Sequence, residues 1–94
     1  MKVRVWRYHV AEEMREEFER EYGTDGSWAV LFATATGFVE TTLYREARST
    51  STYLTVDRFV SEDAWLRFRR ENDAAYTALG ERLAHLTLEQ EELV

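Results

Sequence analysis

A single carboxylate interrupts an otherwise apolar predicted strand. Asp57 lies in the segment 53–59, where β-branched and aromatic residues alternate. A charge buried on a central strand is costly unless it is paired, so we expect a partner for Asp57. If the first strand runs parallel to this one, Arg7 and His9 are the candidates. An Asp–His pair could act as a general base near neutral pH, and the alternative is a structural ion pair that fixes strand register.

Asn72 and Tyr76 form a second pair of polar residues, and their spacing predicts a site that could bind a ligand oxygen. Asn72 follows Trp65 by seven residues and precedes Tyr76 by four, which places the three on one face of a predicted helix. From that face both polar groups could donate hydrogen bonds to a phenolate or carbonyl oxygen. The alternative is a core asparagine bonded to nearby backbone.

Aromatic side chains at helical spacing should surround these polar groups. The predicted substrate contacts are Trp28, Phe32, Trp65 and Phe68, with Arg7 as the charged member. Such a set either lines a ligand pocket or packs a core. An open pocket would favour an enzyme, whereas a filled one would favour a protein without catalysis.

Other chemistries are excluded by composition. The chain has no Cys and two His, and no glycine-rich loop joins a strand to a helix, so neither a metal site nor a phosphate-binding loop is predicted. The net charge of −6 argues against nucleic-acid and membrane-surface binding. Without a long apolar segment, the expected location is the cytoplasm.

The elements that position these residues follow from the pattern of apolar residues. The 94 residues suit one domain spanning 1–94. We predict strands at 2–10, 38–45, 52–59 and within 85–93, and helices at 11–22, at 28–35 and from Ser61 to about Gly80. The order is that of a ferredoxin-like βαββαβ fold with an extra short helix, whose first and third strands are central and, in this interpretation, parallel.

The first strand predicts an oligomer. Val3 and Val5 lie on one of its faces, and Trp6, Tyr8 and Val10 on the other, so both faces are apolar. Helices can cover only one face of the sheet in so short a chain. A second copy packed on the other sheet face would complete a dimeric α+β barrel.

Nearly the whole chain resembles the antibiotic biosynthesis monooxygenase superfamily. The resemblance rests on 22–32, which contains Tyr-Gly-x-Asp-Gly-x-Trp, on the pairs 37–38 and 42–43, and on the strand 53–59. Further matching residues are Ser61, Phe68, Tyr76, Leu86-Thr87 and Glu89. Phe59 stands where the related strand usually has Trp. The resemblance implies a homodimeric α+β barrel with a pocket between helices and sheet in each subunit.

The resemblance also implies a class of reaction. Characterised oxygenases of this superfamily use no flavin, haem or metal, and they oxidise electron-rich phenolic or quinol polyketides. Haem degradation is disfavoured because the first strand lacks Asn and the last long helix lacks His. We therefore predict a cofactor-independent monooxygenase acting on an aromatic or polyketide-type molecule. A cofactor-free isomerase or cyclase, and a non-catalytic dimer that binds a small hydrophobic ligand, are the alternatives.

Overall fold

The computed structural model describes all of residues 1–94 and is an α+β fold. The element order confirms the predicted ferredoxin-like arrangement with an extra short helix. In chain order the elements are β1 Lys2–His9, the 3₁₀ turn η1 Glu12–Met14, α1 Arg15–Tyr22, α2 Ser27–Phe32, β2 Phe38–Arg45, β3 Thr52–Phe59, α3 Glu62–Glu71, α4 Asp73–Leu83, the 3₁₀ turn η2 Ala84–Leu86 and β4 Glu89–Glu92.

The four strands form one antiparallel sheet in the order β2-β3-β1-β4. The expected parallel pairing of the first and third strands is therefore wrong. The helices α1 and α2 return the chain to the end where β1 began, so β2 runs in the direction of β1. The hairpin then turns β3 the opposite way. In the resulting register Arg4 lies opposite Asp57.

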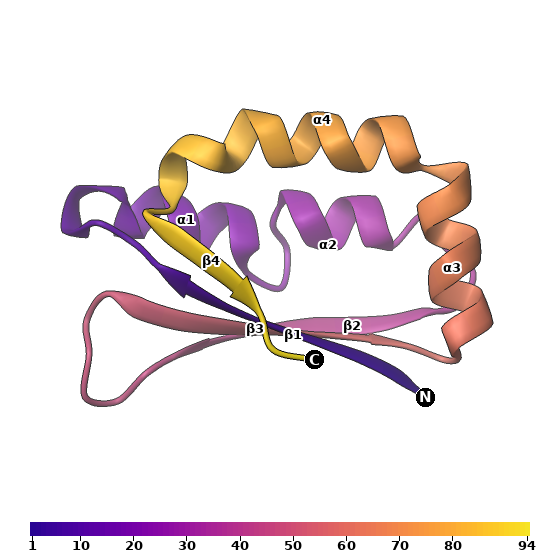
Figure 1. Cartoon of the computed structure of the whole chain (residues 1–94), viewed down its shortest axis with the longest axis horizontal. Helices are drawn as coiled ribbons and strands as arrows, with labels where there is room; N and C mark the ends of the chain where they lie inside the picture. The colour runs from indigo at the N-terminus through magenta and orange to yellow at the C-terminus, as the bar shows by residue number, and fades with distance from the viewer.

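All of the helices lie on one side of the sheet (Figure 1). The helix α4 runs above α1 and α2, and α3 stands at one end, where it connects the sheet to α4. No helix is both long enough and apolar enough to cross a membrane. The layers leave the opposite side of the sheet without a helical cover.

The long helix predicted after Ser61 is two helices. Its start is confirmed, because the Ser61 hydroxyl accepts a hydrogen bond from the Ala64 backbone N–H at 3.0 Å. The helix breaks at Asn72, whose φ of −125° and ψ of 24° leave the helical region. The Asn72 side-chain amide donates to the Phe68 carbonyl at 3.0 Å. Asparagine commonly bonds nearby backbone in this way, in competition with the helix.

Two hydrophobic clusters form the core on the helical side of the sheet. One is built from β1, α1, β3 and the end of α4, and contains Tyr8, Val10, Phe18, Tyr22, Tyr53, Leu79, Leu83 and Leu86. The other contains Phe32, Phe59, Trp65 and Phe68. Polar side chains on the same side of the sheet are also buried, among them Arg4, Thr41, Thr55 and Asp57. The sheet therefore presents a polar region to the helices as well as an apolar one.

The other side of the sheet, the open sheet face, carries the alternate residues of the strands. Its centre consists of Val3 and Val5 from β1 and Leu54 and Val56 from β3, all partly exposed. Arg7 of β1 forms an ion pair with Glu91 of β4 on the same face. The open sheet face is thus aliphatic at its centre and charged toward β4.

Candidate functional site

A cavity of about 550 Å³ lies between the sheet and the helices α2 and α4. Its floor comes from β1, β2 and β3, its walls from aromatic side chains, and part of its rim from the C-terminal segment. The rim includes Thr87, Leu88, Glu89 and Gln90. A volume of this size is in the usual range for sites that bind small molecules.

Asp57 is the buried carboxylate of the cavity floor. Its position on β3 turns the side chain toward the helices, and the residue is only 5% exposed. The Thr41 hydroxyl donates a hydrogen bond to Oδ1, and Arg4 Nη1 lies 3.9 Å from Oδ2. Burial raises the pKa of Asp57, although the Thr41 hydrogen bond and the Arg4 charge oppose that rise. Asp57 is therefore a stronger base than an exposed aspartate.

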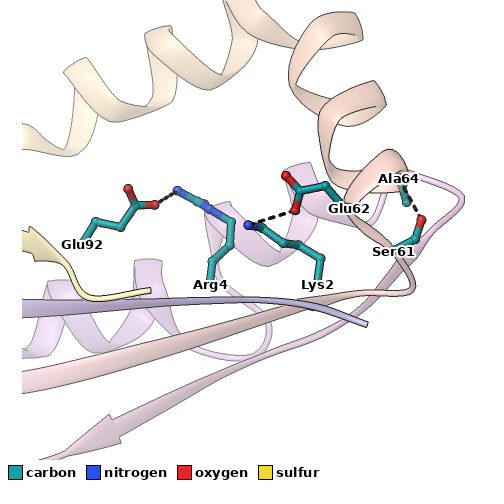
Figure 2. A network of polar contacts seen from close by, with 6 residues as sticks. All are labelled: Lys2, Arg4, Ser61, Glu62, Ala64 and Glu92. Atoms are coloured by element: carbon teal, nitrogen blue, oxygen red, sulfur yellow. Dashed lines mark hydrogen bonds and ion pairs between the residues drawn. The ribbon is translucent and has the colours of Figure 1, made fainter.

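Arg4 lies on β1 next to Asp57 and is 6% exposed. Its guanidinium makes one hydrogen bond, from Nη2 to the Glu92 carboxylate of β4 at 2.9 Å (Figure 2). The guanidinium also lies 4.0 Å from the ring centre of Trp65 and 5.7 Å from that of Trp6. These contacts hold the cation in place. The remaining N–H groups have no protein acceptor and can bind a ligand oxygen.

Six aromatic residues surround these two charges. They are Trp6, Tyr8, Tyr22, Trp28, Phe32 and Tyr76. Tyr76 meets Trp28 edge to face at 5.0 Å, and its own ring carries the Arg69 guanidinium at 3.9 Å. Burial raises the pKa of Tyr8 and of Tyr22, so both phenols stay neutral across the physiological range.

Trp28 contributes the one buried side-chain donor without a hydrogen-bond partner. Its indole N–H is closed to water and makes no hydrogen bond of ordinary geometry, although the Tyr22 hydroxyl lies close enough to oppose the rise in the pKa of Tyr22. Such a group is usually satisfied in native proteins. Trp28 therefore contributes its ring surface, and not its N–H, to the cavity wall.

Comparison with protein-family models and with curated proteins found no match. Solved structures do match. SnoaB, a cofactor-independent oxygenase from Streptomyces nogalater, aligns over 98% of this chain and 89% of its own. A mutant form of SnoaB gives 24% identity with a TM-score of 0.68, and another structure of the protein gives 25% identity with a TM-score of 0.62. A protein of Nitrosomonas europaea, proposed to be an antibiotic biosynthesis monooxygenase, has a TM-score of 0.69 at 11% identity, over 99% of this chain and 94% of its own.

The chain has the antibiotic biosynthesis monooxygenase fold. The predicted resemblance is therefore confirmed for the architecture. In this monooxygenase fold, four of the residues singled out from the sequence line one cavity: Asp57, Tyr76, Trp28 and Phe32. They bring a base, a phenol and two aromatic walls together.

Five other predicted site residues lie outside the lining. Trp65 and Phe68 are buried in the second core cluster, and Asn72 is at the junction of α3 and α4. His9 and Arg7 are exposed, with side chains on the far side of β1. Neither contacts Asp57, so the predicted partners of that carboxylate are wrong. They depended on a parallel register, whereas the antiparallel one brings Arg4 and Thr41 to Asp57.

Several residues that line the cavity were not predicted from the sequence. Arg4 shares its side of β1 with Trp6 and Tyr8, so residue alternation and an antiparallel register would have placed it in the cavity. Thr41 follows from the same argument for β2. No sequence signal marks the C-terminal rim. No cluster of three or more His, Cys, Asp or Glu side chains is arranged to hold a metal ion.

Proposed function

We propose that this protein is a cofactor-independent monooxygenase that oxidises an electron-rich aromatic or polyketide-type molecule in the cavity. The observation that carries the proposal is the buried pair of Asp57 and Arg4 at the floor of an open, aromatic-walled cavity. The similarity to SnoaB, a cofactor-independent oxygenase, supports the same class of reaction.

Asp57 serves as the general base in this proposal. It removes a proton from the substrate, and its raised pKa brings it closer to that of a weakly acidic phenol or anthrone. The Arg4 guanidinium, which has free N–H groups, stabilises the negative charge that develops on the substrate oxygen. The two residues thus convert a neutral aromatic into an electron-rich anion.

The anion itself supplies the electrons for oxygen. With an anthrone, the anion passes one electron to O₂, and the resulting radical pair combines to form a carbon–oxygen bond. The peroxide then breaks its O–O bond as the second ring C–H bond is lost. One oxygen atom becomes the quinone carbonyl and the other leaves as water, so the substrate provides every electron. The aromatic walls reduce the access of water to the intermediates.

We also propose that two copies pair through the open sheet face. Val3, Val5, Leu54 and Val56 form an aliphatic centre there with no helix above it. A sheet-to-sheet dimer of this kind should bury upwards of ~2,000 Å² in total. Each cavity would remain within its own subunit, on the far side of the sheet.

Oxygen uptake with anthralin, a dihydroxyanthrone, tests the reaction. The protein should accelerate uptake above spontaneous oxidation, with one O₂ consumed per danthron formed and one ¹⁸O atom entering the new carbonyl. Asp57→Asn should reduce the catalysed rate by about 100-fold or more. Asp25→Asn, the same change at an exposed turn, should leave it unchanged. Deuterium exchange at the ring methylene without O₂ uptake would instead support the isomerase alternative.

A further inference from the structure

The charged side chains that line the cavity carry a net negative charge. Three carboxylates and two guanidiniums line it: Asp57, Glu81, Glu89, Arg4 and Arg69. Both guanidiniums already bond carboxylates from outside the lining. Arg4 bonds Glu92 at 2.9 Å, and Arg69 bonds Asp73 at 3.0 Å. An anionic ligand would therefore meet no cation that lacks a carboxylate partner.

Glu92 forms the shorter of the two ion pairs made by Arg4, the cation on the cavity floor. It lies on β4 opposite Trp6, and its carboxylate reaches over β1 to Arg4 (Figure 2). The Glu92 side chain is half exposed, whereas that of Arg4 is almost fully buried. Glu92 bonds Arg4 more closely than Asp57 does, at 2.9 Å against 3.9 Å. The guanidinium therefore lies between two carboxylates.

Arg4 can still bind a neutral oxygen. Its Nη2 donates to Glu92, and its other N–H groups have no protein acceptor. A ligand carbonyl can accept from them while a neighbouring ligand hydroxyl donates to Asp57. A ligand carboxylate in the same position would face two charged carboxylates, Asp57 and Glu92, and like charges placed together oppose binding. The substrate anion of the proposed reaction differs, because it forms only as its proton neutralises Asp57.

We propose that Glu92 is a specificity-determining residue, which through its ion pair with Arg4 makes the cavity select uncharged keto-phenols and reject aromatic ligands that carry a carboxylate. This inference rests on the proposed function for the choice of aromatic ligands. It adds a charge filter that depends on a residue of the C-terminal strand, outside the cavity lining.

Calorimetric titration with two matched quinones tests the filter. Danthron is an uncharged dihydroxyanthraquinone, and rhein is the same ring system with one carboxylic acid. The protein should bind rhein about tenfold more weakly than danthron, equivalent to about 1.4 kcal/mol. Glu92→Gln, which keeps a hydrogen-bond acceptor for Arg4 but removes the charge, should reduce that difference, while the part caused by Asp57 remains.

The control is Glu91→Gln. Glu91 is the neighbouring residue on β4, is exposed to a similar extent, and bonds Arg7 at the same 2.9 Å, but on the open sheet face. The change in net charge is the same, and the preference for danthron should persist. A second measurement uses the unsubstituted protein, in which high ionic strength should reduce the preference because it screens the partly exposed Glu92.

Three results would overturn the inference: rhein binding as tightly as danthron, an unchanged preference in Glu92→Gln, or no binding of danthron. Both probes are already quinones, so their binding does not depend on oxygen chemistry. If the preference is observed but anthralin oxidation is not, the charge filter stands and the monooxygenase proposal fails. If oxidation is observed without the preference, the reverse holds.

Discussion

Replacing Asp57 by Asn should leave the protein at least as stable as before near neutral pH, even though it breaks a buried ion pair. The two side chains have nearly the same shape, and the Asn carbonyl can still accept the hydrogen bond from Thr41. Only the negative charge is lost. The outcome therefore depends on whether that charge stabilises the folded state.

Two opposing effects decide whether Asp57→Asn raises or lowers the stability of the folded state. The attraction between Asp57 and Arg4 at 3.9 Å corresponds to about 4 kcal/mol at an effective dielectric constant of ~20. The cost of removing the Asp57 carboxylate from water opposes this attraction. Burial is the largest influence on the pKa of Asp57, and that pKa is raised overall. Burial therefore outweighs the attraction. Arg4 also keeps Glu92 after the substitution, so no unpaired cation is left behind.

The pH dependence gives the sharper measurement. Because the pKa of Asp57 is higher in the folded state than its ordinary 3.8, the folded state binds more protons between the two values. The contribution of Asp57 to stability is therefore greatest below 3.8 and falls as pH rises through the folded-state pKa. Each pKa unit between the folded and the ordinary value corresponds to about 1.4 kcal/mol of stability lost at neutral pH.

The assay is thermal unfolding by circular dichroism from acid to neutral pH. The advantage of Asp57→Asn should grow with pH and then level off, with each 1 kcal/mol raising Tm by about 4–8 °C. Asp25→Asn, at an exposed turn, should not show this trend. A lower Tm for Asp57→Asn at neutral pH, or a difference that is the same at every pH, would refute the reasoning.

Three further predictions concern the fold. Val56→Asp places a charge at the centre of the open sheet face and should convert the proposed dimer to a monomer in sedimentation, whereas a monomeric unsubstituted protein would contradict the proposal. Asn72→Leu removes the hydrogen bond to Phe68 and should lower Tm while turnover per folded molecule is retained; lost turnover at unchanged Tm would place Asn72 in the site after all. Ser61→Ala removes the cap of α3 and should cost about 1 kcal/mol in denaturant unfolding, whereas Ser61→Gly should cost less.

Most elements of the fold could be predicted because their sequences satisfy local rules. The strands β2 and β3 have the predicted bounds, since the residues of each alternate in type and a polar loop separates them. The burial of Asp57 also followed, because the charge interrupts an apolar strand. The break at Asn72 was missed, since Trp65 and Tyr76 keep helical spacing across it.

The residues that line the cavity were harder to predict, because the lining depends on strand direction and on segments that are distant in the sequence. An antiparallel register exchanges the neighbours of Asp57, which is how Arg4 replaces Arg7 and His9. The rim depends on the last residues of the chain, where β4 is only Glu89–Glu92 and consists of exposed polar residues. The position of β4 is set by pairing with β1, and no apolar pattern in the sequence predicts that position.

The placement of the tryptophans gives the protein an intrinsic optical reporter. Trp6 and Trp28 line the cavity, and Trp65 lies against the Arg4 guanidinium beside Asp57. All three indoles of the chain therefore lie within or next to the site. A bound quinone would quench much of the ultraviolet emission of the protein, and a shift in the emission maximum would follow ionisation at the cavity floor. Occupancy can thus be followed in real time without attaching a dye.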